Sequence, residues 1–208
     1  MIWQHRRQLR SWTLLICTPQ PQIRLLMELV SEQILPGYRL RLGSGREQAT
    51  LVKFMQLSYQ EIFPEQDDFS HLAVTVGKYF SRETPLWWVE LAESAIVKNS
   101  STVPWLQPIA CLWLGNAVDQ VKGDRHAHVF LLYVMPEYRR QGIGSALMRY
   151  AEDWARAKGD RQIGLQVFQR NQSALHLYQR LGYQNQALWM LKSLYPQQEF
   201  GMGDEGLL

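Results

Sequence analysis

The chain lacks the features that mark several large classes of protein. Its 208 residues include only two cysteines, Cys17 and Cys111, and no Cys-x-x-Cys pair. A disulfide framework or a cysteine-ligated metal site is therefore not expected. No apolar run in the sequence approaches the roughly 18 residues that span a bilayer. Together these absences disfavour a disulfide-bonded secreted protein and a membrane partner, and we expect the protein to be cytoplasmic.

The sequence also has little excess of either positive or negative charge. The formal net charge is +3, which could attract a polyanionic ligand but is too small to indicate a nucleic-acid partner. Residues 1–27 contain arginines but no Asp or Glu. This stretch suits a transit peptide, a native leader, or an artefact of a start site upstream of Met27, and the sequence leaves all three open. The oligomeric state stays open as well.

Domain boundaries follow from where apolar periodicity begins and ends. We expect a leader at 1–35, disordered or a start-site artefact, because nothing before Pro36 shows a strand or helix. One domain should fill 36–195, and a polar, mobile tail should follow at 196–208. Strands are expected at 38–42, 86–92, 108–116, from Ala127, at 163–168 and at 187–194. Helices are expected at 46–63, 68–80, 145–158 and 171–181.

The most informative segment reads HVFLLYVMPEYRRQGIG and ends at Gly144. An apolar strand, a proline break, two arginines and a Gly-x-Gly turn lead into a helix. Such a loop presents bare amides at a positive helix N-terminus, which suits pyrophosphate. Arg139 and Arg140 could grip phosphate oxygens, and Gly142 and Gly144 let a phosphate approach the backbone. The amides expected to bind belong to Gln141, Gly142, Ile143, Gly144 and Ser145.

A dinucleotide site would begin with a similar glycine turn. However, the third glycine of that fingerprint would fall at Leu147. The strand near 163–168 also lacks the terminal acidic residue that would hold a ribose. The pattern therefore disfavours a dinucleotide.

A second block, NQSALHLYQRLGY, starts at Asn171. Asn171 is a good helix cap, Ala174 and Tyr178 share one helical face, and Gly182 ends the helix. Alone, Tyr178 would be read as a partly buried aromatic residue.

The two blocks together resemble the GCN5-related N-acetyltransferase (GNAT) family. Arg139-x-x-Gly142-x-Gly144 is similar to its acetyl-coenzyme A (acetyl-CoA) signature, and Asn171, Ala174, Tyr178 and Gly182-Tyr183 are similar to its second block. The resemblance implies an α/β (α+β) fold: a mixed, mostly antiparallel sheet with helices on both faces, splayed at the acetyl-CoA site.

The resemblance also implies a reaction. A primary amine of a small-molecule or peptide acceptor would attack acetyl-CoA directly, without a metal. Tyr178 would protonate or hydrogen-bond the departing thiolate. Val134 would offer main-chain groups to pantetheine, and Asn171 would contact the pantetheine or pyrophosphate arm.

The general base is not identified by the sequence. The strand before the pyrophosphate-binding loop carries no carboxylate. Gln166, which lies shortly before the second block, has an amide side chain that cannot accept a proton. His126, His128, Glu90 and solvent water remain as candidates. A CoA-binding sensor or partner-binding module with little catalysis, or an enzyme that transfers another acyl group, therefore stays as an alternative.

Overall fold

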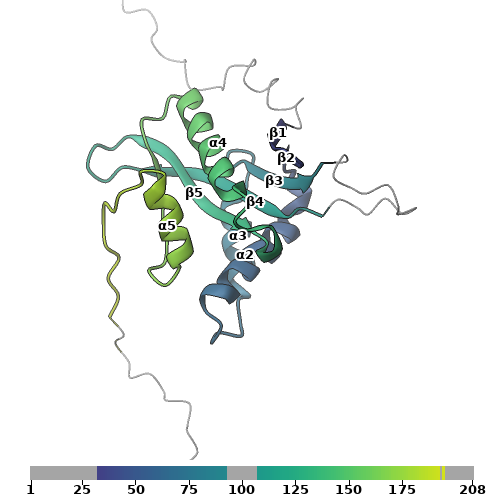
Figure 1. Ribbon diagram of the computed structural model, residues 1–208. Coiled ribbons are helices and arrows are strands. Elements are labelled where there is room, and N and C mark those ends of the chain that lie inside the picture. Colours follow the sequence, from purple (N-terminus) through teal and green to yellow (C-terminus); the bar gives the residue numbers. More distant parts are fainter. Residues whose placement is uncertain (1–31, 93–106, 193, 195–208) are drawn as a thin grey trace, which may run out of the picture.

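The computed structural model describes residues 32–92, 107–192 and 194 (Figure 1). Its elements, with short 3-10 helices written η, are β1 (Glu32–Leu35), β2 (Tyr38–Leu42), η1 (Gly45–Glu47), α2 (Gln48–Ile62), α3 (His71–Tyr79), β3 (Leu86–Leu91), β4 (Ala110–Val118), β5 (Arg125–Val134), η3 (Pro136–Tyr138), α4 (Ile143–Lys158), β6 (Ile163–Leu165) and α5 (Gln172–Arg180).

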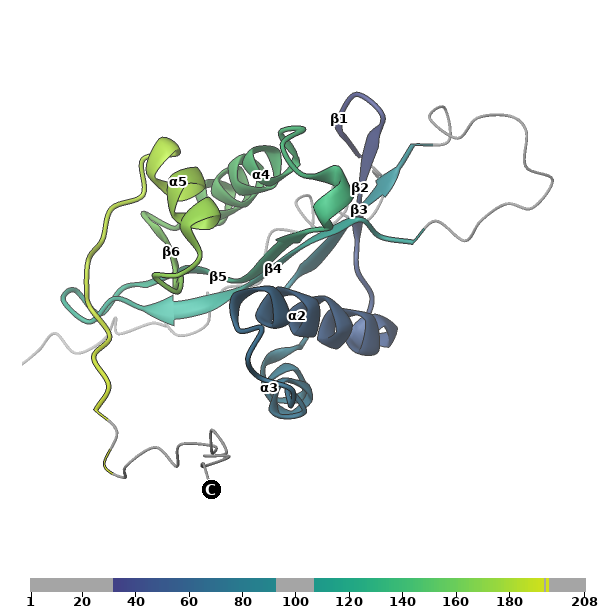
Figure 2. The same ribbon diagram turned by 60° about the horizontal axis from the view of Figure 1, so that its bottom comes forward.

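The six strands of these residues form one sheet, ordered β1 to β6 as in the chain. Every neighbouring pair from β1 to β5 is antiparallel, and β6 runs parallel to β5. Helices α4 and α5 cover one face, and α2 and α3 cover the other (Figure 2). The architecture confirms the expected mixed, mostly antiparallel sheet with helices on both faces.

Each face of the sheet has its own core, because successive side chains of a strand point to opposite faces. Trp87 packs in the α4-side core against Tyr150 and Trp154. Trp88 packs in the α2-side core, where its ring meets Phe54 at 5.1 Å. Both tryptophans are buried, so packing is the role of each, and neither lines an open pocket.

A β-bulge in β5 changes which residues face each core. The β4–β5 register shifts between Trp113 and Leu114, and Phe130 is the extra residue. Val129 packs on the α4 side before the bulge, whereas Leu132 and Val134 do so after it. A Cβ at Gly115 would lie 2.0 Å from the Phe130 ring, so only glycine fits beneath that ring. Such bulges bend a strand and increase its twist.

The sheet opens just after this bulge. β6 pairs with β5 only from Ala127 to Val129. From Phe130 to Val134, β5 has no strand partner on that side among the residues described. This is the splay that the resemblance predicted.

Three expectations for the elements were wrong. The sheet starts with β1 upstream of Pro36, in the stretch expected to lack any strand. The strand expected at 163–168 ends at Leu165, because the chain turns there toward α5. The strand expected at 187–194 is absent from 187–192 and at 194, which pair with none of the six strands.

Candidate acetyl-CoA site

The loop between η3 and α4, residues 139–142, is the segment expected to bind pyrophosphate, and we call it the cradle. Arg140 has a φ of 64°, and Gly142, the residue before α4, has a φ of 87°. Positive φ values in close succession turn backbone N–H groups toward one side, which creates an anion-binding concavity. A non-glycine residue such as Arg140 pays a conformational cost for this geometry, and such strain is common at ligand sites.

The first turn of α4 leaves its amides open to a ligand. Helix geometry gives the N–H groups of Ile143, Gly144 and Ser145 no intrahelical acceptor. Gly142 has no side chain to cap them, and no side-chain cap hydrogen bond is formed. The helix dipole adds partial positive charge at the same point. The geometry therefore suits pyrophosphate at the positions that the sequence indicated.

The β1–β2 hairpin braces this cradle, a feature that the sequence analysis missed. Tyr38 donates a hydrogen bond to Gln141 Oε1. A Cβ at Gly142 would lie 3.8 Å from Leu35. The signal for this contact in the sequence is the apolar surface of Leu35 and Tyr38, which is favourable to bury. It does not show that the partner surface belongs to α4.

The two signature arginines differ in what they contact. Arg139 donates from Nη2 to both carboxylate oxygens of Glu61, at 2.8 and 2.7 Å, and from Nε to the carbonyl of Val134 at 2.8 Å. Arg140 is exposed and forms no ion pair with a described residue. Arg139 is thus committed to protein partners, and Arg140 is the arginine better placed for phosphate.

The second block forms α5 as expected. Asn171 caps it by accepting a hydrogen bond from the Ala174 amide at 3.1 Å. Gly182, with a φ of 90°, follows its end. A Cβ at Gly144 would lie 3.4 Å from Leu177, so α5 packs closely over the start of α4.

Tyr178 lies on the face of α5 that packs against the α4-side core, with its ring 5.7 Å from that of Tyr183. Burial raises the pKa of Tyr178 to about 12. The phenol therefore keeps its proton at neutral pH and can donate to a leaving group.

Among the base candidates, His128 lies closest to the opening of the sheet. It pairs with Gly164, one residue before β6 pairing ends, and its ring is 5.5 Å from that of Phe130 at the bulge. Burial, with a smaller contribution from His126, lowers its pKa. His128 is therefore neutral at pH 7 and able to accept a proton.

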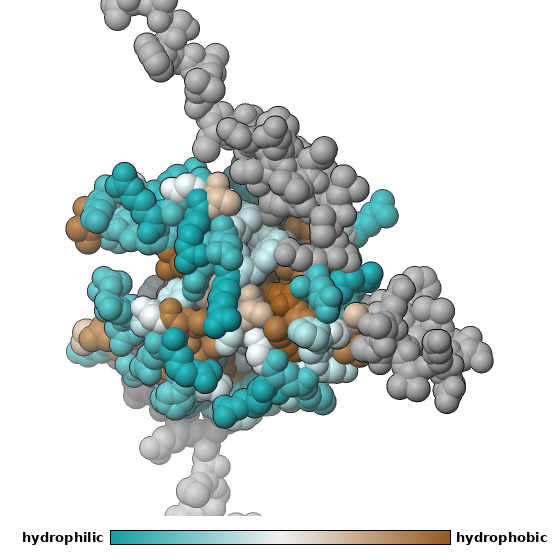
Figure 3. Space-filling model, turned by 45° about the horizontal axis from the view of Figure 1, so that its top comes forward, coloured by the Kyte–Doolittle hydropathy of each residue, from teal (hydrophilic) through white to brown (hydrophobic). Residues whose placement is uncertain are grey.

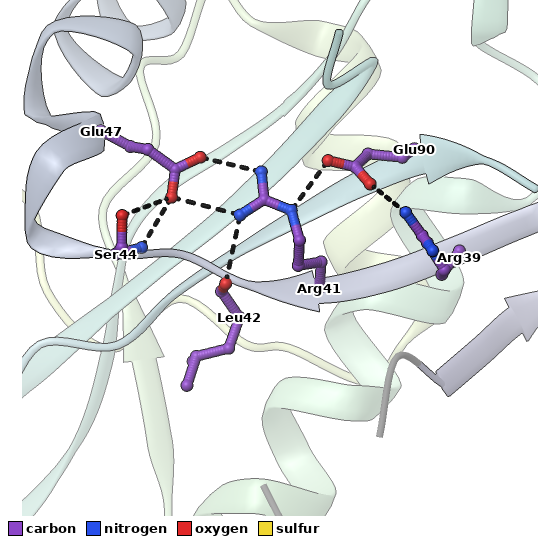
Figure 4. A network of polar contacts seen from close by, with 6 residues as sticks. All are labelled: Arg39, Arg41, Leu42, Ser44, Glu47 and Glu90. Carbon is purple, nitrogen blue, oxygen red and sulfur yellow. Dashed lines mark hydrogen bonds and ion pairs between the residues drawn. The ribbon is translucent and has the colours of Figure 1, made fainter. Parts of the chain in front are cut away.

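His126 lies two residues further from the opening, beside Gln162. Glu90 is buried and paired with Arg39 Nη2 at 2.9 Å and Arg41 Nε at 2.8 Å. Arg41 also binds Glu47, which accepts from Ser44, so one network ties β2 and β3 to the start of α2 (Figure 4). Glu90 thus holds the scaffold together.

The C-terminal end of α2 reaches across the opening to the β6–α5 connection. Phe63 meets Phe168 at 4.9 Å, and Glu65 pairs with Arg170 at 2.5 Å. The charge of the Glu65 carboxylate is therefore partly neutralised. A cavity of about 410 Å³ adjoins this end, lined by Leu57, Gln60, Glu61, Tyr133, Met135, Pro136 and Glu137.

In the view of Figure 3, hydrophilic side chains cover most of the described surface, and hydrophobic surface lies between hydrophilic ridges near its centre. An apolar centre with a polar rim is typical of binding surfaces.

No helix in the described part of the chain is long and apolar enough to cross a membrane. Within the same residues, no three His, Cys, Asp or Glu side chains gather as a metal site would require.

The chain is similar to known acetyltransferases in sequence and in fold. The model of the acetyltransferase (GNAT) family matches residues 52–183. An uncharacterized N-acetyltransferase of Methanocaldococcus jannaschii is 32% identical over 74 residues, which are 36% of this chain and 31% of that protein. Thialysine N-epsilon-acetyltransferase of Bos taurus is 41% identical over 61 residues, which are 29% of this chain and 36% of that enzyme. The chain thus matches only about a third of each relative's length.

A solved structure of a putative acetyltransferase from Pyrococcus furiosus has the same fold, with a TM-score of 0.55 and 24% identity. It covers 74% of this chain and 99% of its own. Because the family model matches more than half of the chain, the protein belongs to the acetyltransferase (GNAT) family. Acetyl transfer from acetyl-CoA is the reaction of that family.

Proposed function

We propose that the protein is an N-acetyltransferase that transfers the acetyl group of acetyl-CoA to a primary amine of a small-molecule or peptide acceptor. One observation carries the proposal: the positive-φ loop at Arg140 and Gly142 opens onto the uncapped first turn of α4, and α5, the helix that carries Tyr178, packs closely over that turn. Amides there would hold the pyrophosphate, and no metal is needed.

Pantetheine would extend from the cradle along the open edge of β5, where the sheet is splayed. In that groove the backbone of Val134 is the nearest strand-like partner to the loop. Its carbonyl already accepts from Arg139, so we assign its contribution to the N–H group. Asn171 fixes the start of α5 through its cap, and we propose that it orients Tyr178 while contacting the coenzyme arm.

The amine nitrogen would attack the thioester carbonyl, forming the C–N bond as the C–S bond breaks. Tyr178 would donate its proton or a hydrogen bond to the departing sulfur, because its raised pKa keeps it protonated. His128 would take the proton from the acceptor ammonium, directly or through water, because it is neutral and lies where β5 and β6 separate. We propose that this reaction takes place in the cytoplasm.

The first experiment is acetyl-CoA binding by calorimetry on the full chain, followed in the same sample by thiol release with a panel of amines and peptides. Binding with release identifies the transferase and its acceptor class. Acyl-CoAs of greater chain length in the same assay test transfer of another acyl group. No binding by the folded protein would contradict the proposal.

Tyr178→Phe separates a catalyst from a CoA-binding sensor. A catalyst should lose roughly a hundredfold in turnover with CoA affinity unchanged. Tyr79→Phe is the matched control, since Tyr79 is 44% exposed on α3, on the opposite face of the sheet. A sensor would bind CoA and release no thiol in either variant.

A further inference from the structure

Arg139, at the start of the cradle, is held by α2, which lies on the other face of the sheet from α4. Glu61 lies in the last turn of α2, and Arg139 is the first residue after η3. Both carboxylate oxygens of Glu61 contact Arg139 Nη2, within 2.8 Å. This contact spans 78 residues of sequence, so it joins two elements that no local interaction connects.

Tyr133 completes the arrangement from the end of β5. Its hydroxyl donates to Glu61 Oε1 at 2.6 Å, and its ring lies 5.4 Å from the guanidinium carbon of Arg139. Burial and the hydrogen bond to Glu61 raise the pKa of Tyr133, which keeps this hydroxyl a donor. One carboxylate thereby joins α2, the end of β5 and the start of the cradle.

Arg139 has only the two N–H groups of Nη1 left to offer a phosphate. Its Nη2 serves Glu61, and its Nε serves the Val134 carbonyl at 2.8 Å. A phosphate that bound this guanidinium would have to compete with the Glu61 carboxylate, which already lies at ion-pair distance. The carboxylate also balances the positive charge of the guanidinium. Moving Arg139 would also free the Val134 carbonyl, on the strand edge where the sheet opens.

We propose that Glu61 is a positioning residue that acts through Arg139, and that Arg139 braces the phosphate loop and the end of β5 instead of binding phosphate. The inference rests on the proposed function, because its main measurement is CoA affinity. It assigns to Glu61, a residue of α2, a role in shaping the coenzyme site.

The two possible roles of Arg139 predict opposite effects of Glu61→Ala on CoA affinity. If Arg139 is a brace, the variant should bind CoA about fivefold more weakly, because the loop loses its anchor. If Arg139 binds phosphate, the unmasked positive charge should make CoA bind more tightly. Unchanged or tighter binding overturns the proposal.

Glu137→Ala is the matched control, since Glu137 lines the same cavity and forms no ion pair with a described residue. It removes the same charge beside the loop without touching Arg139, and its CoA affinity should be unchanged or slightly higher. Glu61→Gln can still accept from Tyr133 and Arg139, so it should recover most of the affinity. Equal losses in Glu61→Gln and Glu61→Ala would contradict the brace.

A double-mutant cycle tests the pair without any ligand. Glu61→Ala and Arg139→Ala should each lower stability to urea, and the double variant should lose clearly less than the sum. Additive losses, with normal CoA binding by the wild-type chain, would overturn this inference alone. If the wild-type chain failed to bind CoA, the proposed function and the inferred role would both fall, even if the cycle showed coupling.

Discussion

Replacing Glu90 distinguishes a scaffold residue from a general base. Its side chain is 5% exposed and forms ion pairs at 2.8 and 2.9 Å with Arg41 and Arg39, whose side chains are 34% and 31% exposed. Removing one member of a buried ion pair leaves the charge of its partner uncompensated, which typically lowers the free energy of unfolding by about 3 to 5 kcal/mol. Because water can reach both arginines here, we expect Glu90→Ala to lower the free energy of unfolding by about 2 to 3 kcal/mol.

Such a loss would lower Tm by about 6 to 9 °C in a chain of this size. The measurements are urea and thermal unfolding, together with turnover corrected for the folded fraction. Glu47→Gln is the matched control in the same network, because it removes a more exposed partner of Arg41 and should cost under about 1 kcal/mol.

Glu90→Gln then supplies the test of catalysis. Gln can accept from one arginine but cannot accept a proton, so turnover per folded molecule should change less than about twofold if Glu90 is structural. A stable Glu90→Gln protein with turnover reduced about a hundredfold or more would refute this reasoning and identify Glu90 as the base.

Three further predictions concern the coenzyme site and the base. Gly142→Val should abolish CoA binding in calorimetry while the protein stays folded by circular dichroism, because a β-branched residue disfavours a φ of 87° and its side chain would enter the cradle; unchanged affinity would contradict the cradle. With a lowered pKa, His128 should leave kcat/KM level above about pH 6.5 and decreasing only at lower pH, as protonation removes the base. His128→Gln should lose this acid limb and about a hundredfold in turnover, whereas His126→Gln should keep both; the reverse pattern would move the role to His126. A chain starting at Met27 should bind CoA normally, but one starting at Pro36 should bind it more weakly, since it lacks β1 and the contact of Leu35 with the cradle; equal affinity would show that β1 is dispensable.

Glu47 should make stability sensitive to acid. Burial opposes ionisation of Glu47, but hydrogen bonds from Arg41 and from the Ser44 amide outweigh it, so its pKa lies below the ordinary value of 4.5. A carboxyl with a lowered folded-state pKa stabilises the fold above its unfolded pKa, and this stabilisation disappears as pH decreases through the folded value. Urea midpoints should therefore decrease below about pH 4.5, and Glu47→Gln should reduce that decrease.

The sequence by itself determined the features that depend on local chemistry. Gly182 predicted the end of a helix, and the structure places it, with a φ of 90°, directly after the end of α5. Asn171 predicted a helix cap, and its side chain caps α5. Strand β2 matches its predicted bounds, and α4 starts within two residues of its predicted start. These features follow from backbone sterics, capping and periodicity, which act over a few residues.

Only the tertiary structure decided which distant residues meet. The bulge at Phe130 reverses the alternation of β5, and no periodicity in a single strand shows a register shift that depends on its partner β4. The strand expected at 187–194 has suitable β propensity, but residues 187–192 pair with no strand of the sheet, and such pairing is a tertiary contact that propensity does not determine. Nothing in the sequence around Glu61 indicates that Arg139 would bind it, because an ion pair across 78 residues depends on the packing of α2 against β5.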